Sequence, residues 1–160
     1  MGISLGENSF LTTSGALSAT ASAGSVALGE ASYFTATGTS DLEVISTTND
    51  ITLARNAYFQ TTSTGDITVT ASAGGIDLTG AHIVSGGDLD TLSQTLTLDT
   101  SPAPPSLVYS YLSAAGAMNI VVTAGDIIIV TDTFTLPADS SLSASGIVSV
   151  TTEVGGITLG

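Results

Sequence analysis

The 160-residue chain has no cysteine and no tryptophan, and it holds one histidine and a single basic residue, Arg55. Without cysteine there is neither a disulfide framework nor a thiolate metal site, and one histidine leaves little for zinc coordination. Fourteen acids against one base give a formal net charge of −13. Binding to nucleic acid or to an anionic membrane needs clustered cations, so the composition excludes both as partners.

Only 9% of the residues are charged, whereas 42% are hydrophobic. The acidity therefore accompanies enough apolar residues to build a core, unlike the composition of a disordered acidic segment. The chain is rich in Val, Ile, Thr and Gly, which favours strands joined by tight turns. Its opening residues lack the basic and apolar regions of an ordinary secretion signal, and no later run is long enough to span a bilayer. We expect an all-β domain without direct membrane insertion.

A pair of apolar residues separated by one position recurs along the chain at steps of 20 to 31 residues. A second such pair lies nine residues before the first in most copies, and a third apolar position follows it. Each repeat thus holds three short strands, as in a parallel β-helix. The copies of the first pair are Ile3-x-Leu5, Val26-x-Leu28, Ile51-x-Leu53, Ile76-x-Leu78, Leu96-x-Leu98, Ile127-x-Ile129 and Ile157-x-Leu159.

The pattern predicts one domain over residues 1–160, an all-β, parallel, right-handed β-helix (β-solenoid) of about six turns. A β-sandwich is the main alternative, but its hairpins would not keep a constant nine-residue offset inside a 25-residue repeat. Lateral loop insertions are expected near 101–116 and 136–146. The first is marked by residues that do not suit a central strand, namely Pro102, Pro104, Pro105, Tyr109 and Tyr111.

The segment Gly65–Leu89, which reads GDITVTASAGGIDLTGAHIVSGGDL, resembles the repeats of filamentous-haemagglutinin-type adhesins of two-partner secretion. The likeness is best over about residues 41–90. It implies an extracellular right-handed β-helix and transfers no catalytic residue. The chain departs from that family in its length, its longer turns and the absence of the family's secretion domain.

The first and last apolar pairs are expected to be the same strand of the repeat, so that copies stacked end to end would continue the helix in phase. Neither end shows an amphipathic helix, a proline-blocked strand or a cluster of charge. We therefore expect a head-to-tail homopolymer formed by strand addition, an open assembly without closure. The alternative is that both ends are cut surfaces of a longer β-helix. The expected interface comprises Ile3, Ser4, Leu5, Phe10, Leu11, Val148, Val150, Ile157, Thr158 and Leu159.

Three aspartates, Asp41, Asp66 and Asp88, each precede the first strand of successive turns and are expected to form a column. Stacked carboxylates repel each other, and Ca²⁺ with its preference for oxygen ligands would relieve that repulsion. The favoured alternative is that each aspartate caps nearby backbone N–H groups. Apart from this calcium column, no cofactor is expected.

Two aromatic pairs, Tyr33-Phe34 and Tyr58-Phe59, are 25 residues apart and should stack on adjacent turns. They indicate shaft packing more than a sugar-binding platform, and which member of each pair faces inward stays open. For catalysis the only candidates are Glu43, Asp77, Asp99, Arg55 and His82, which fall in different turns without a visible nucleophile.

The sequence therefore predicts no enzyme. It predicts a structural subunit that self-assembles head-to-tail by strand stacking into an extracellular filament. The alternative is a fragment of a secreted β-helical adhesin that contacts a surface glycan or protein through its lateral loops.

Overall fold

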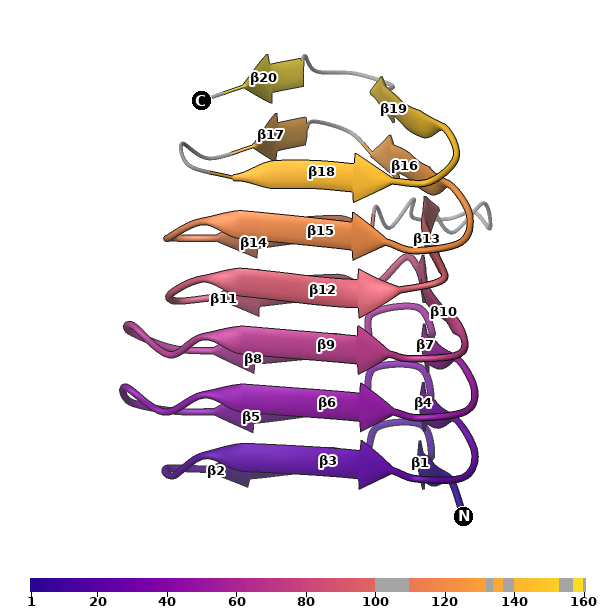
Figure 1. The fold of residues 1–160 in the computed structure, drawn as a ribbon. Coiled ribbons are helices and arrows are strands. Elements are labelled where there is room, and N and C mark those ends of the chain that lie inside the picture. Colours follow the sequence, from indigo (N-terminus) through magenta and orange to yellow (C-terminus); the bar gives the residue numbers. More distant parts are fainter. Residues whose placement is uncertain (100–109, 132–133, 137–139, 153–156, 160) are drawn as a thin grey trace, which may run out of the picture.

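The computed structural model describes residues 1–99, 110–131, 134–136, 140–152 and 157–159, which form 20 strands and no helix. The fold is the predicted one, an all-β parallel β-solenoid (Figure 1). The three main sheets together extend through about 5 turns, whereas the sequence predicted about six. In the described part of the chain, no helix is long and apolar enough to cross a membrane.

Equivalent strands of successive turns stack into three parallel sheets, and a short fourth sheet lies near the C-terminal end. Sheet A comprises β1 (Ile3–Leu5), β4 (Val26–Leu28), β7 (Ile51–Leu53), β10 (Gly75–Thr79), β13 (Thr95–Asp99), β16 (Ile127–Thr131) and β19 (Val148–Thr152). Sheet B comprises β2 (Phe10–Thr13), β5 (Tyr33–Ala36), β8 (Tyr58–Thr61), β11 (His82–Ser85) and β14 (Tyr111–Ala114). Sheet C comprises β3 (Leu17–Ala21), β6 (Leu42–Ser46), β9 (Ile67–Ala71), β12 (Leu89–Ser93), β15 (Met118–Val122) and β18 (Ser141–Ala144). The fourth sheet pairs β17 (Phe134–Leu136) with β20 (Ile157–Leu159).

The core is a set of apolar columns inside the three-sided shaft. Residues in register on stacked strands share one environment, because alternate side chains of every strand point inward. In sheet A the inward column is closed to solvent through five turns, with each member at most 1% exposed. Val and Ile suit such positions because branched side chains pack well on a pleated surface. The column comprises Val26, Ile51, Ile76, Leu96 and Ile127.

The corner between sheets A and B uses a left-handed residue in each of the first four turns. Asn8, Ala31, Asn56 and Gly80 have φ between 55° and 61°. The N–H groups of the first three donate to the carbonyls of Glu30, Arg55 and Gly80 in the next turn, at 2.7 to 3.0 Å. Gly and Asn tolerate this conformation, whereas the Cβ of alanine crowds the following carbonyl. Ala31 is therefore the strained member of the column.

The C-terminal turns differ from the sequence prediction. Residues 141–144, expected in a lateral loop, form β18 and pair with β15 in sheet C. Val148-x-Val150 lies nine residues before Ile157-x-Leu159, as Met118-x-Ile120 does before Ile127-x-Ile129, so the two were expected to stack on each other. Val148 and Val150 instead pair with Ile127 and Ile129 in sheet A. The pair Ile157-x-Leu159 then falls one strand later, above Phe134. The prediction failed because β18 reads Ser-Leu-Ser-Ala, whose single large apolar residue does not produce the repeated pair.

We expect Ala31→Gly to raise the free energy of unfolding by about 0.5–1 kcal/mol, because glycine adopts positive φ without the steric cost. For a domain of this size the midpoint of thermal unfolding should rise by roughly 2 °C. Differential scanning calorimetry measures it. Ala27→Gly, at the outward position of β4, is the matched control and should lower stability. Equal effects of the two substitutions would contradict the strain at Ala31.

Candidate functional site

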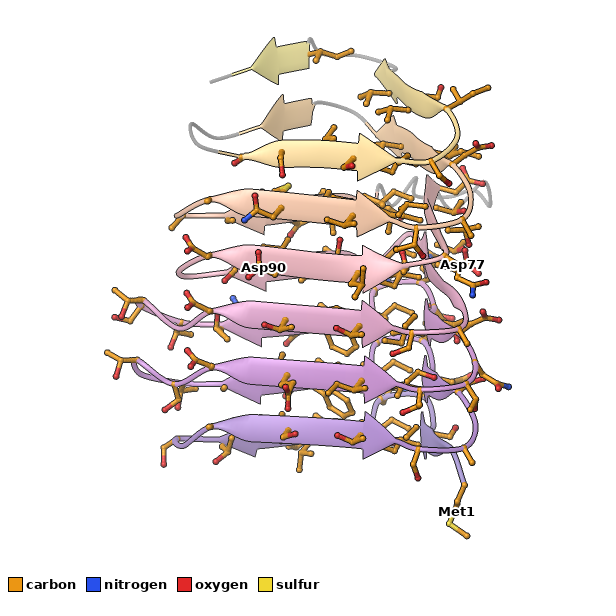
Figure 2. All side chains as sticks on the ribbon, viewed as in Figure 1. Met1, Asp77 and Asp90 are labelled. Atoms are coloured by element: carbon orange, nitrogen blue, oxygen red, sulfur yellow. The ribbon has the colours of Figure 1, made fainter. Side chains whose placement is uncertain are left out.

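The N-terminal turn forms one open end of the shaft. Strands β1, β2 and β3 are terminal strands of sheets A, B and C, and each pairs on one side only. Phe10 is 64% exposed and Leu11 44%, whereas Phe34, in register above Leu11, is 1% exposed. Phe10 and Leu11 thus meet solvent at positions whose counterparts in later turns are half-buried or fully buried. Figure 2 shows Met1 beyond this end of the shaft.

The backbone of this turn leaves hydrogen-bonding groups directed away from the shaft. In β1 the N–H of Ile3 donates to Ser25 and the carbonyl of Leu5 accepts from Gly29, both at 2.9 Å. Successive residues of an extended strand direct these groups to opposite sides, so those of Ser4 point outward along the axis. By the same alternation in β3, between Leu17 and Ala21, the groups of Ser18 and Thr20 point outward. Such an edge is a template for an added strand.

The C-terminal end is formed by β18, β19 and β20, which end sheet C, sheet A and the short sheet. Apolar side chains are exposed here too: Ile147 at 68%, Val148 at 44% and Ile157 at 50%. The interface residues expected from the sequence thus lie in strands at the two opposite ends of the shaft. Their expected phase is wrong, because Ile3–Leu5 belongs to sheet A and Ile157–Leu159 stacks on β17. A copy whose β1 stacked on β19 would place its β2 on β20, whereas sheet C ends at β18, one turn before β19 and β20.

The aspartates at the corner before sheet C form a column in which each carboxylate accepts a hydrogen bond from the next turn. Asp66 N–H donates to Asp41 Oδ1 at 3.0 Å, Asp88 N–H to Asp66 Oδ1 at 2.8 Å, and Ala117 N–H to Asp88 Oδ1 at 2.8 Å. The described residues contain no group of three or more His, Cys, Asp or Glu that could hold a metal ion. Each of the three carboxylates caps a backbone N–H group of the next turn, which is the role that the sequence analysis favoured.

A second set of aspartate caps lies at the corner before sheet A. Asp50 Oδ1 accepts from Gly75 N–H and Asp126 Oδ1 from Ile147 N–H, both at 2.8 Å. The signal was present in the sequence, because both aspartates directly precede an apolar pair. A carboxylate at such a corner satisfies an N–H group that the strand ladder does not reach.

Removing one cap should destabilise the shaft. Asp66→Ala leaves the N–H of Asp88 without its acceptor, and we expect a loss of about 1 kcal/mol in the free energy of unfolding. Asp66→Asn keeps a carbonyl acceptor at the same place and should lose less. Urea titration followed by circular dichroism compares the two. If both variants lose the same stability, the hydrogen bond is not what the aspartate contributes.

Five rings form a continuous stack on the outer face of sheet B. Successive ring centroids lie 5.1, 4.7, 5.0 and 4.7 Å apart and neighbouring planes are within 8° of parallel. The tyrosines of the two aromatic pairs thus face outward, while Phe34 and Phe59 stack in the core at 5.5 Å. The three inner rings are covered on both faces and offer only their edges to solvent, whereas a sugar platform needs an open face. We call this stack the aromatic ladder: Phe10, Tyr33, Tyr58, His82 and Tyr111.

His82 belongs to the ladder, a role that sequence reasoning missed although it lies in register with Tyr58. Burial lowers the pKa of the His82 imidazole below its ordinary value, because the stacked rings displace water from the charged form. The other polar candidates lie on other faces. Glu43, on sheet C, accepts a hydrogen bond from Ser18 Oγ at 2.8 Å, while Asp77 and Asp99 lie on sheet A. The structure does not bring these groups to one place.

Arg55 and Asp77 both line a shallow hollow of about 390 Å³ beside sheet A. Burial raises the pKa of the Asp77 carboxyl, the negative charge of Asp50 adds to this, and a hydrogen bond with Thr97 opposes it. The remaining lining residues are Leu28, Thr52, Leu53, Ala54 and Thr79, which supply no further charge.

We expect Asp77→Asn to raise the thermal stability slightly at pH 7. The folded-state pKa of Asp77 is raised, so its neutral form stabilises the fold at low pH and that contribution is lost as pH rises through the folded pKa. The variant's advantage should therefore shrink as the pH falls to the ordinary range of an aspartate. Calorimetry at several pH values tests it. Asp66→Asn also removes one charge, and an equal gain there would trace the effect to net charge.

The predicted lateral loop is described only in part. Pro102, Pro104, Pro105 and Tyr109 lie outside the described residues. Tyr111 begins β14 and is 41% exposed at the end of the aromatic ladder.

Comparisons with protein-family models, with curated proteins and with solved structures found no match. No family model therefore identifies the adhesin-type repeats that Gly65–Leu89 resembles. The chain is a parallel β-solenoid with three sheets.

Proposed function

We propose that the protein is a structural subunit that assembles head-to-tail by strand stacking into an extracellular filament. The observation that carries the proposal is the open N-terminal turn, in which the apolar side chains of Phe10 and Leu11 accompany outward-directed backbone groups on Ser4 and Ser18. The opposite end offers strands of the same three-sided arrangement with exposed apolar residues. The extracellular location rests on the likeness of Gly65–Leu89 to adhesin repeats.

The joint would use the interactions that hold the shaft itself. Strand β1 would add to β19 and β2 to β20 through backbone hydrogen bonds, each with a net contribution of about 1 kcal/mol. Burying the exposed parts of Phe10 and Leu11 would contribute on the order of 1 kcal/mol each. The two joined surfaces differ, so each added copy presents a fresh end, and growth gives a filament with no closed ring.

The test is to block the N-terminal edge without touching the backbone hydrogen bonds between successive turns. Ser4→Pro with Ser18→Pro removes two outward N–H groups, and proline is tolerated in an edge strand where its nitrogen faces solvent. We expect filaments of the wild-type chain in electron micrographs and discrete particles of the double variant.

Ser4→Ala with Ser18→Ala is the matched control. It removes the same hydroxyls, including the Ser18 bond to Glu43, but keeps both N–H groups, so filaments should persist. Circular dichroism verifies that all three proteins fold. Filaments of unchanged length from the proline variant, or discrete wild-type particles at every concentration, would overturn the proposal.

The alternative is a fragment of a secreted β-helical adhesin, in which further turns cover these ends and a lateral loop contacts a glycan or a protein. The exposed ring of Tyr111, a residue of the predicted lateral loop, is the observation that favours it. A glycan array with the wild-type chain and with Tyr111→Ala tests this alternative, which predicts binding that the substitution abolishes.

A further inference from the structure

The acids are distributed unequally among the three faces of the shaft. Outward positions carry Asp77 on sheet A and Glu43 and Asp90 on sheet C, and Figure 2 shows Asp77 and Asp90 on different sides. The strands of sheet B, all of them described, contain no Asp or Glu. For a chain of net charge −13, side-by-side contact through the acidic faces brings carboxylates together. Sheet B is the face whose own strands bring no acid into such a contact, although Asp41, Asp66 and Asp88 lie at its corner with sheet C.

The same face carries the aromatic ladder. Phe10 and Tyr111 are exposed, and the rings between them are half-buried. The outward neighbours of the ladder are uncharged, with Gln60 and Val84 half-buried and Ser113 exposed. Aromatic residues are enriched and charged residues depleted at the centres of protein interfaces. This outer face of sheet B, residues of β2, β5, β8, β11 and β14, is called the ladder face below.

The period of the ladder favours a particular partner. Its rings repeat every 4.7 to 5.1 Å, which is the spacing of stacked strands in a sheet. A surface that meets each ring with an equivalent group must repeat at the same interval over five turns. A second copy of this chain has that period and the same uncharged face.

We propose that two copies pair laterally through their ladder faces about a two-fold axis. Such a contact is isologous and stops at two copies, because each ladder face is covered by the ladder face of the other copy. It is separate from the head-to-tail joint: strand stacking lengthens the shaft, and the ladder contact doubles its width. Where filaments form, they would be paired.

Gln60→Glu tests the contact. It places a carboxylate in the middle of the ladder face at almost constant side-chain volume, and the two-fold axis brings a second carboxylate opposite it. We expect the dissociation constant of the lateral dimer to rise about a hundredfold, since like charges opposed in an interface cost several kcal/mol. Sedimentation equilibrium measures it. The experiment uses the Ser4→Pro, Ser18→Pro background, so that head-to-tail growth adds no mass.

Gln94→Glu is the matched control. Gln94 is also half-buried, but it lies between β12 and β13, away from sheet B. The same change there adds the same charge, and the dimer should persist. Ser113→Glu, at an exposed position on β14, is a second disruptive variant should Gln60→Glu fail to fold, which circular dichroism reveals.

A dimer in the parent and in Gln94→Glu, with monomers in Gln60→Glu or Ser113→Glu, supports the proposal. Monomers in the parent at every concentration, or equal dimerisation of all variants, overturn it. Neither result bears on the filament, because wild-type micrographs decide that separately. Filaments of single width would overturn the pairing alone.

Discussion

The backbone hydrogen bonds between successive turns are the constraint on which the rest of the structure depends. They place each residue directly beneath its counterpart one turn later. Side chains of the same kind therefore stack into columns along the shaft. Apolar columns close the core, left-handed residues stack at one corner, and carboxylates cap backbone N–H groups at two others. The aromatic ladder arises in the same way on the outside of sheet B. The effect of a single residue on stability therefore depends on the residues stacked above and below it.

The same constraint determines what the ends and faces offer. A column has a first and a last member, and these lack the neighbour that buries all the others, which is why Leu11 is 44% exposed while Phe34 above it is 1% exposed. Along the sides, the columns separate chemistry by face, with outward carboxylates on the strands of sheets A and C and rings on the strands of sheet B. Growth along the axis and pairing across it would thus use different groups. The first depends on backbone edges and the second on an uncharged surface.

Much of the candidate site was predictable, and the failures have physical causes. The interface residues lie in strands at the two ends, and the capping role favoured for Asp41, Asp66 and Asp88 agrees with their hydrogen bonds. The phase of the ends was wrong because Leu142 is the single large apolar residue of β18, so this strand lacks the apolar pair that Met118 and Ile120 supply in β15. Backbone hydrogen bonds can hold such a strand in the sheet whatever its side chains are. A search for repeated apolar pairs does not detect it.

The sequence by itself determined the fold class, because a repeat of three apolar strands at a near-constant interval has no other way to bury its inward residues than by stacking turns. It also determined that the surface is acidic. Only the tertiary structure decided the pairing of the last turns, the outward direction of Tyr33 and Tyr58, and the place of His82 between two tyrosines. These features depend on which strand lies above which and which side of it faces the core, and spacing alone leaves both open.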